Sequence, residues 1–367
     1  MTARLNSADK DFESAFVSLL KAKRETNEDV SIAVSSILDD VRDRGDDAVI
    51  ELTRRFDRFD IKIEDLRIDS DTIKKAIGQC EPEIIQALKL AARRIEDFHK
   101  RQMPNDLDYV DKAGLRLGYR WNAISAAGLY VPGGTAAYPS SVLMNAIPAK
   151  IAGVERLVMV VPTPDGTINP LVLAAASVSG VNEIYRIGGA QAIGALAYGT
   201  ETIAPVDKIV GPGNAYVAAA KRQVFGVVGI DMIAGPSEIL LVADKNNDPN
   251  WIAADLLSQA EHDVAAQSIL ITDDKEFSEY VSKAVEETLK TLSRAEIATK
   301  SWHDFGAIII VGNLDDAPPL IDRLAPEHLE LAVKNPNAIA AKVRNAGAIF
   351  LGRFAPEALG DYLAGPN

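Results

Sequence analysis

The sequence is short of cysteine, of positive charge and of long apolar runs. Its one cysteine, Cys80, excludes an internal disulfide and any metal site built from several cysteines, and it fits a reducing cytoplasm. A formal charge of −13 opposes binding to nucleic acid or to an anionic membrane, since both need a basic face. No stretch approaches the ~20 apolar residues that cross a bilayer, and the charged N-terminus is unlike a signal peptide. We therefore expect a cytosolic protein with neither partner.

The composition that remains is typical of a soluble globular protein. The 367 residues are 47% apolar and 25% charged, and this length favours two domains. From residue 126 onward, apolar strands alternate with helices, the pattern of parallel sheets covered on both faces. We predict an α/β protein whose second α/β domain spans 127–237. Its first α/β domain is predicted to be discontinuous, with 26–126 joined to 238–367, after an N-terminal helical arm over 1–25.

Towards both ends of the chain, the sequence pattern predicts fewer details. Apolar side chains at helical spacing predict helices through residues 8–100. Residues 102–121, with Pro104 followed by alternating side chains, indicate an extended connector or a hairpin. We expect a helix over 336–345 and a polar loop over 360–367.

A possible metal site lies at the end of a helix predicted over about 249–262. Gln259 and His262 are three residues apart, so on a helix they share one face and lie about one turn apart. An amide oxygen and an imidazole nitrogen placed in this way can bind one divalent metal. Alone, such a pair is more often a polar helix edge. Asp361 is a candidate for an anionic ligand.

Three glycine-rich turns follow predicted strands, at 132–134, 188–191 and 211–214. Glycine lets the backbone approach a phosphate, and the next helix offers free N–H groups. None of the turns completes the G-x-G-x-x-G pattern, and each alone is more often an ordinary tight turn. Three at one edge of a sheet favour a nucleotide cleft at the carboxyl ends of the strands. Its polar contacts would be Tyr130, Gln191 and Asn214.

Glu327 and His328 open a predicted strand, and a carboxylate beside an imidazole suits proton transfer. Neighbouring residues on a strand point to opposite faces, so both can serve one site only where the backbone is irregular. Pro326 favours such an irregularity, while the alternative is an exposed loop pair. Ser237, in the turn 235–238, could contact a substrate.

Seven short motifs, in this order along the chain, resemble histidinol dehydrogenase, and the resemblance covers essentially the whole sequence. They are 128–134, 188–192, 211–214, 234–238, 259–262, 326–330 and 360–362. The resemblance implies two incomplete Rossmann-like domains with parallel sheets, and small helical segments exchanged between the subunits of a homodimer. It also implies zinc-dependent, NAD-linked oxidation of L-histidinol to L-histidine via bound L-histidinal, the last step of histidine biosynthesis.

The resemblance further implies a role for each candidate residue. Zinc and substrate would be held by Gln259, His262 and Asp361, and substrate also by Ser237 and His328. Proton transfer would fall to Glu327 and His328, and contacts to NAD to Tyr130, Gln191 and Asn214.

The end of the sequence departs from the family pattern. The family has a histidine directly after the motif at 365–367, and a C-terminal segment that supplies a glutamate and a zinc-binding histidine to the partner subunit. Neither has a counterpart after Asn367. We therefore expect zinc to keep three protein ligands, with its other positions open to water, and the exchanged part of the dimer to be missing.

Two alternatives stay open on the sequence alone. An alcohol dehydrogenase of the same superfamily, acting on a sulfonated diol, resembles this chain and has the same zinc and NAD requirements. A module of two α/β lobes that binds a small ligand without chemistry would show the same alternation of strands and helices.

Overall fold

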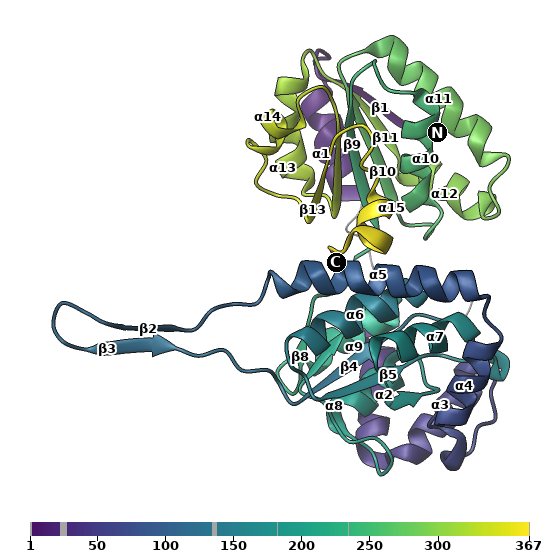
Figure 1. Cartoon of the computed structure of the whole chain (residues 1–367). Coiled ribbons are helices and arrows are strands. Elements are labelled where there is room, and N and C mark those ends of the chain that lie inside the picture. Colours follow the sequence, from purple (N-terminus) through teal and green to yellow (C-terminus); the bar gives the residue numbers. More distant parts are fainter. Residues whose placement is uncertain (1, 23–27, 134–137, 182, 234, 367) are drawn as a thin grey trace. The chain divides into compact units, whose positions relative to one another are not determined.

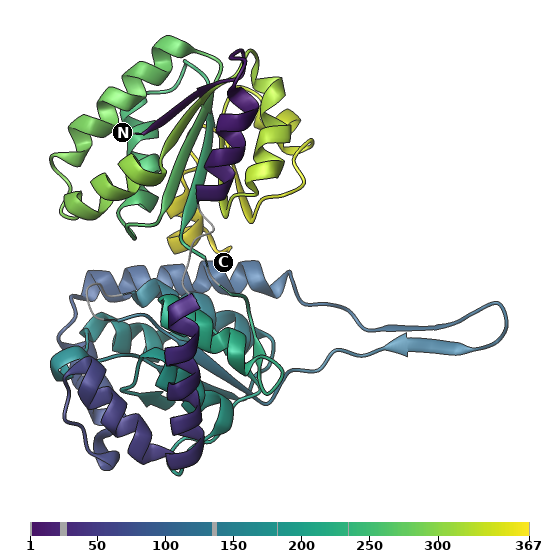
Figure 2. The same cartoon turned by 180° about the vertical axis from the view of Figure 1, so that it is seen from behind.

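The structure is a computed structural model that describes residues 2–22, 28–133, 138–181, 183–233 and 235–366, with the side chains of 28, 29 and 361 left aside. It divides into two compact units. Unit 1 contains 1–26 and 235–360, and unit 2 contains 27–234 and 361–367. Each unit is built on a parallel sheet with helices on both faces (Figure 1, Figure 2), which confirms the predicted α/β class.

The sheet of unit 2 has the Rossmann strand order without its sixth strand. Neighbouring strands are parallel and lie in the order β6-β5-β4-β7-β8. In chain order this is 3-2-1-4-5, and the order reverses between β4 and β7. The strands are β4 (Ala126–Tyr130), β5 (Arg156–Val160), β6 (Glu183–Tyr185), β7 (Lys208–Val210) and β8 (Gly229–Ile230).

Alternate residues of these strands face two separate cores, because side chains alternate across a strand. Leu129 packs into one core and Tyr130 into the other. The Tyr130 face is covered by α2 (Glu28–Arg44), α3 (Asp46–Asp57), α8 (Gly189–Tyr198) and α9 (Ala215–Val224). The Leu129 face is covered by α4 (Ser70–Gly78), α5 (Pro82–Lys100), α6 (Pro139–Ile151) and α7 (Pro170–Ser179).

Unit 1 repeats this plan with one extra edge strand. All neighbouring strands are parallel, in the order β1-β11-β10-β9-β12-β13. Without β1 the order is again 3-2-1-4-5, with its reversal between β9 and β12. The strands are β1 (Ala3–Asn6), β9 (Glu238–Ala243), β10 (Gln267–Thr272), β11 (Ala307–Ile310), β12 (His328–Ala332) and β13 (Ala348–Leu351).

The helices of unit 1 also form two layers. Leu241 faces α10 (Pro249–Ala260), α11 (Lys275–Leu289) and α12 (Ala295–Phe305). Leu240 faces α1 (Phe12–Ala22), α13 (Ala317–Leu324) and α14 (Pro336–Ala340). Short turns complete the chain: η1 (Ile63–Asp65), η2 (Pro164–Gly166), η3 (Leu314–Asp316), α15 (Glu357–Leu359) and the π-helical η4 (Gly360–Ala364).

The predicted hairpin is present as β2 (Leu107–Val110) and β3 (Arg116–Tyr119), which pair antiparallel. Both views show it extending away from the body of unit 2, between α5 and β4 (Figure 1, Figure 2).

The predicted grouping of 26–126 with 238–367 is wrong for 27–126 and for 361–367. Residues 27–126 belong to unit 2 and not with 238–360. The Ile68 N–H donates to the Ile184 carbonyl at 2.9 Å, and the Arg186 N–H donates to the Leu66 carbonyl at 2.9 Å, so this segment is bonded to the β6 region. Helical periodicity shows that a helix buries one face, but it does not show against which sheet.

The predicted helical arm at 1–25 is also wrong in part. Residues 3–6 form β1, which pairs with β11 at the edge of the unit 1 sheet. A four-residue edge strand has too little alternation to stand out in the sequence. At the other end, 360–364 is a π-helical turn in place of the expected loop, and α14 ends at Ala340, earlier than predicted.

Candidate active site

The predicted acid–base pair lies at the start of β12, where the backbone is irregular as expected. Ala325 has a left-handed conformation with φ of 46°. The Ala348 N–H donates to the Glu327 carbonyl at 2.9 Å, and a Cβ on Gly347 would lie only 2.5 Å from the same oxygen. The close approach at Gly347 therefore holds the chain at Glu327 just before the regular strand begins.

The backbone of Glu238, the first residue of β9, holds both side chains of the pair. His328 Nδ1 lies 3.0 Å from the Glu238 carbonyl oxygen, and the Glu238 N–H donates to Glu327 Oε2 at 3.2 Å. A carbonyl oxygen only accepts, so Nδ1 carries a proton, and in the neutral ring Nε2 is the nitrogen that can accept one. Glu327 Oε2 is 3.8 Å from His328 Nδ1, close enough to stabilise a protonated ring. His328 is buried and Glu327 is half-exposed.

The predicted metal ligands Gln259 and His262 lie at the end of α10, although the predicted common helical face is only partly correct. The helix ends at Ala260, and His262 lies in the turn that follows. The His262 N–H still donates to the Gln259 carbonyl at 3.0 Å, so the two residues stay close. His262 Nδ1 lies 2.6 Å from the Ser258 carbonyl. That contact fixes the proton on Nδ1 and leaves Nε2 suited to a metal.

The third predicted metal ligand, Asp361, is not tested by the structure. The side chain of Asp361 is outside the described residues. Among the described residues, no three histidine, cysteine, aspartate or glutamate side chains are placed to hold a metal ion. A buried amide and an oriented imidazole thus fit part of a zinc site, and the full ligand set stays a prediction.

All of these unit 1 residues lie at the amino edge of the sheet. The first residues of β9 and β12 are Glu238 and His328, and the chain from α10 enters β10 through 261–266. The Gln267 N–H, at the start of β10, donates to the Ser237 carbonyl at 2.9 Å. Doubly wound sheets usually bind ligands at their carboxyl edge, so this location departs from the usual rule.

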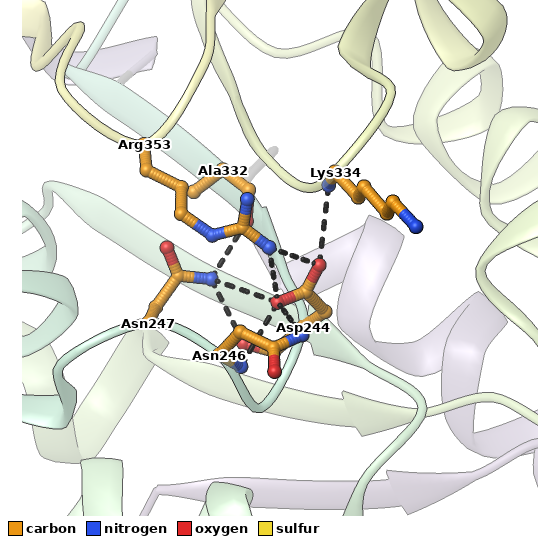
Figure 3. Close-up of polar contacts among 6 residues, drawn as sticks. All are labelled: Asp244, Asn246, Asn247, Ala332, Lys334 and Arg353. Atoms are coloured by element: carbon orange, nitrogen blue, oxygen red, sulfur yellow. Dashed lines mark hydrogen bonds and ion pairs between the residues drawn. The ribbon is translucent and has the colours of Figure 1, made fainter.

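The carboxyl edge of the same sheet is filled by a polar network around Asp244 (Figure 3). Both oxygens of Asp244 accept from Arg353 Nη2, at 2.6 and 2.5 Å. Asn247 Nδ2 joins the ends of two strands by donating to the Asp244 and Ala332 carbonyls, at 2.8 and 2.7 Å. Burial raises the pKa of Asp244, but the hydrogen bonds from Arg353 and Asn246 outweigh it and hold that pKa below its usual range. The network stabilises this edge with the chain's own side chains.

A group of buried carboxyl side chains in unit 1 was missed by the sequence analysis. Burial, with the neighbouring Asp255, raises the pKa of Glu330 to about 9, and burial raises the pKa of Asp255 to about 6. The two side chains are hydrogen-bonded and hold one proton between them near neutrality. Glu330 Oε1 also accepts from the Glu357 N–H at 2.6 Å. The only signal was that Glu330 follows His328 by two positions, and so shares its face of β12.

In unit 2, the predicted nucleotide contacts lie at the carboxyl edge of the sheet. The Gly189 N–H, at the start of α8, donates to the Tyr130 hydroxyl at 3.1 Å. Burial raises the pKa of Tyr130 to about 12, so the phenol is neutral. Gln191 is 1% exposed, and within the described residues neither atom of its amide has a hydrogen-bond partner. An unsatisfied buried amide is rare and is a reason to look for a ligand or a water there.

The turn 211–214 is fixed beside Tyr130 by an ion pair of the buried Lys221 with the more exposed Asp231. Gly211 has φ of 112°, and a Cβ there would lie 2.1 Å from the Tyr130 carbonyl oxygen, so only glycine fits. Lys221 Nζ donates to the Gly211 carbonyl at 2.9 Å and pairs with Asp231, which accepts from the Gly211 N–H at 2.7 Å. Asn214 is exposed and caps α9 through its side chain. The sequence analysis did not single out Lys221 or Asp231.

Two parallel sheets in Rossmann order, one of them with a carboxylate and an imidazole side by side at its edge, are typical of the dehydrogenases. The sequence model of the family described as histidinol dehydrogenase matches residues 20–367. The chain belongs to the histidinol dehydrogenase family, and it is thus an oxidoreductase of histidine biosynthesis.

Individual relatives agree with this assignment. A Rhodospirillum rubrum protein named histidinol dehydrogenase is 68% identical, over 100% of this chain and 85% of the relative. One from Ruegeria pomeroyi, with the same name, is 64% identical over 99% of this chain and 84% of its own length. The crystal structure of histidinol dehydrogenase from Elizabethkingia anophelis matches with a TM-score of 0.94 and 38% identity, over 100% of this chain and 84% of that one. Over the described residues, no helix is long and apolar enough to cross a membrane.

Proposed function

We propose that this chain oxidises L-histidinol to L-histidine in two steps, with zinc and NAD as cofactors and as a homodimer. The observation that carries the proposal is the arrangement around Glu238. Its carbonyl binds Nδ1–H of His328, so that Nε2 of the neutral ring can accept a proton, and its N–H binds Glu327 beside it. Membership of the histidinol dehydrogenase family supports the substrate.

In the first step, His328 Nε2 accepts the proton of the substrate hydroxyl while a hydride leaves the same carbon for NAD⁺. The hydroxyl proton goes to the imidazole, and bound NAD⁺ would take the two electrons of the C–H bond with the hydride. The Glu238 carbonyl keeps its bond to Nδ1–H throughout, so the ring does not turn. The nearby Glu327 carboxylate favours the imidazolium that forms.

In the second step, Glu327 accepts a proton from water as the water oxygen adds to the aldehyde carbon. The aldehyde oxygen takes the proton that His328 accepted in the first step, which produces the hydrate of L-histidinal. After His328 has released its first proton, Nε2 accepts one from a hydrate hydroxyl as the second hydride passes to a second NAD⁺. The half-exposed Glu327 can reach water, which suits this role better than the buried His328. Keeping the reactive amino aldehyde in one site prevents side reactions.

The proposed cofactors are assigned to different residues. Gln259 and His262, with Asp361, would hold zinc, which supplies a positive charge that anchors the substrate amine and imidazole; Ser237 would contact the substrate. Tyr130, Gln191 and Asn214 would bind NAD at the carboxyl edge of unit 2. The unsatisfied Gln191 amide and the position of 211–214 at the reversal of strand order support the NAD site.

The substitution Glu327→Gln tests the division of labour. We expect oxidation of L-histidinal to fall by about 10²–10⁴-fold, because general base catalysis contributes that much, with little change in the first oxidation. NADH formed per L-histidinol should then fall from two to one when semicarbazide traps the aldehyde. Glu261→Gln, at the partly exposed C-cap of α10, is the matched control and should keep two. Two NADH per turnover in the Glu327 variant would overturn the assignment.

Substrate choice is tested by comparing NADH formation with L-histidinol and with dihydroxypropanesulfonate. We expect turnover of L-histidinol alone. Preferential oxidation of the sulfonated diol would assign the same residues to a different alcohol, and tight ligand binding without NADH would refute the enzyme mechanism.

A further inference from the structure

Glu330 is a buried acid on the strand that carries His328. It is 3% exposed and lies in β12, two positions after His328. Strand pairing sets it beside Leu241, which belongs to the core under α10, so the Glu330 side chain faces that helix. The proposed mechanism does not use this acid, although burying an acid is costly unless it has hydrogen-bond partners.

Glu330 joins three segments of unit 1. Its Oε1 accepts from the N–H of Glu357, the first residue of α15, at 2.6 Å. Its carboxyl group is also hydrogen-bonded to the side chain of Asp255, in α10. Two carboxyl groups share such a bond only when one of them is protonated, and burial with the neighbouring Asp255 raises the pKa of Glu330 to about 9. The protonated acid therefore donates to Asp255 and accepts from the Glu357 N–H.

The partner of Glu330 in α10 is linked to the end of that helix. Asp255 lies one helical turn before Gln259, a proposed zinc ligand. The Asp255 carbonyl accepts from the Ser258 hydroxyl at 2.7 Å, and the Ser258 carbonyl binds His262 Nδ1 at 2.6 Å. Hydrogen bonds and short backbone segments thus connect Glu330 with the imidazole of His262.

We propose that Glu330 is a positioning residue that sets the end of α10 relative to β12, and with it the Gln259 and His262 side chains that would hold zinc. The inference rests on the proposed zinc site and assigns a role to a residue outside the proposed ligand set. Removing a group that orients metal ligands from behind typically lowers metal affinity by about 10–100-fold.

The chemistry of position 330 suits orientation better than simple packing. The core between the sheet and α10 is otherwise built from apolar side chains such as Leu241 and Leu256, and an apolar residue at 330 would fill the same space. Such a residue would fix no direction. A hydrogen bond does, because it weakens steeply when it is bent, and Glu330 makes one bond to each of two neighbouring segments.

Two substitutions of Glu330 separate the hydrogen bonds from the packing. Glu330→Gln keeps the shape, can donate to Asp255 and can accept from the Glu357 N–H, so we expect an unchanged dissociation constant for zinc. Glu330→Leu fills a similar volume but makes neither bond, so we expect this constant to rise by about 10-fold. Competition between the metal-free full chain and a chromogenic chelator, at neutral pH and without substrate, measures it.

A third variant breaks the same link from the helix side. Asp255→Ala changes a partly exposed position where alanine suits the helix, so it tests the link even if Glu330→Leu does not fold. We expect the same rise in the zinc dissociation constant. Combining it with Glu330→Leu should give no further rise, because both changes break one shared bond.

Leu331→Ala is the matched control for a weakened strand. Leu331 follows Glu330 in β12, but its side chain is buried in the core on the opposite face of the sheet. The variant should lower the melting temperature and leave the zinc dissociation constant unchanged. An equal loss of zinc affinity in this control would reduce the role of Glu330 to strand stability and overturn the inference.

The remaining outcomes separate the inference from the proposed function. Unchanged zinc affinity in Asp255→Ala and in a folded Glu330→Leu would refute the positioning role alone, and so would an equal loss in Glu330→Gln. A parent chain that binds no zinc would refute the proposed metal, and the positioning role with it.

Discussion

His328 Nδ1 and the Glu238 carbonyl oxygen are 3.0 Å apart, so the start of β9 sets the tautomer of an imidazole on the neighbouring strand β12. The bond leaves Nε2 as the only nitrogen of the ring able to accept a proton. His328 can form this bond because it is the first residue of β12 and so lies beside Glu238, the first residue of β9.

The first prediction concerns this imidazole. His328→Gln keeps a hydrogen-bonding side chain but removes the base, so we expect kcat for both oxidations to fall by about 10²–10⁴-fold. Steady-state assays with L-histidinol and with L-histidinal measure the two steps separately. Loss of only one step would contradict a shared base, and an unchanged melting temperature would exclude unfolding as the cause.

The second prediction concerns the proposed zinc. We expect a chelator to abolish activity and added zinc to restore it, because the anchoring charge is lost and returned. His262→Ala should lower the zinc content, measured by atomic emission after dialysis, by more than 10-fold, because it removes a ligand. His303→Ala removes an exposed imidazole elsewhere in unit 1 and is the control. Full zinc retention in the His262 variant would contradict the ligand set.

The third prediction uses the unsatisfied amide of Gln191. Gln191→Met removes two buried polar atoms that lack partners among the described residues, so we expect unfolding to require about 1–3 kcal/mol more free energy. The same change should raise KM for NAD. Gln267 is a matched control, because it is also buried but its Nε2 donates to the Phe305 carbonyl at 3.2 Å. Gln267→Met should therefore destabilise the protein, and stabilisation by both variants would refute the argument.

The fourth prediction concerns pH. The pKa of Glu330 is raised from 4.5 to about 9, so near neutrality the folded protein keeps a proton that the unfolded chain releases. Its contribution to stability is full below pH 4.5 and is lost as pH rises towards about 9. Glu330→Gln keeps a donor for Asp255 without titrating. We expect the variant to be more stable than the parent at pH 8, by about 1–3 kcal/mol, with the difference vanishing near pH 4.5.

Chemical denaturation across this pH range measures the effect. Glu183→Gln is a control of opposite sign, because Arg156 and Tyr185 lower the pKa of Glu183 although burial alone would raise it. That variant should be less stable than the parent at neutral pH. A Glu330 variant that tracks the parent at every pH would show that the buried pair does not share a proton.

The fifth prediction concerns the Asp244 network. Arg353→Met removes the largely buried charged partner of Asp244. We expect the free energy of unfolding to fall by about 1.5–3 kcal/mol at pH 7. The lowered pKa of Asp244 means that its contribution is present above pH ~4, the pKa of an unfolded aspartate, and fades as pH falls through its lower native pKa. The difference in unfolding free energy between the variant and the parent should therefore become smaller at acidic pH. Lys342→Met, from the exposed pair with Asp315, should cost under ~1 kcal/mol.

Local patterns predicted most elements of the fold but not their assembly. The apolar strands from 126 onward were found close to their observed positions, because a strand buried on both faces is apolar throughout. The membership of 27–126 was missed, because an amphipathic helix such as α2 carries no information about which sheet it covers. The edge strand β1 was missed because four residues contain too little pattern.

The same distinction holds for the candidate site: the sequence indicated some of its residues, and only the structure revealed the others. Motifs in the sequence selected Glu327, His328, Gln259 and His262, and the structure brings all four to one edge of a single sheet. The roles of the backbone of Glu238 and of the buried Glu330 were hidden, because they depend on strands that are far apart in the sequence.

By itself, the sequence determined the α/β class, the family and the residues capable of proton transfer, because these follow from short-range periodicity and from the chemistry of side chains within a few positions of each other. Tertiary structure alone decided which nitrogen of His328 is bound to the backbone, which carboxyl groups keep a proton, and which sheet the helices of 27–126 cover. Each of these depends on distances, desolvation and strand register between distant segments, and so appears only once the chain has folded.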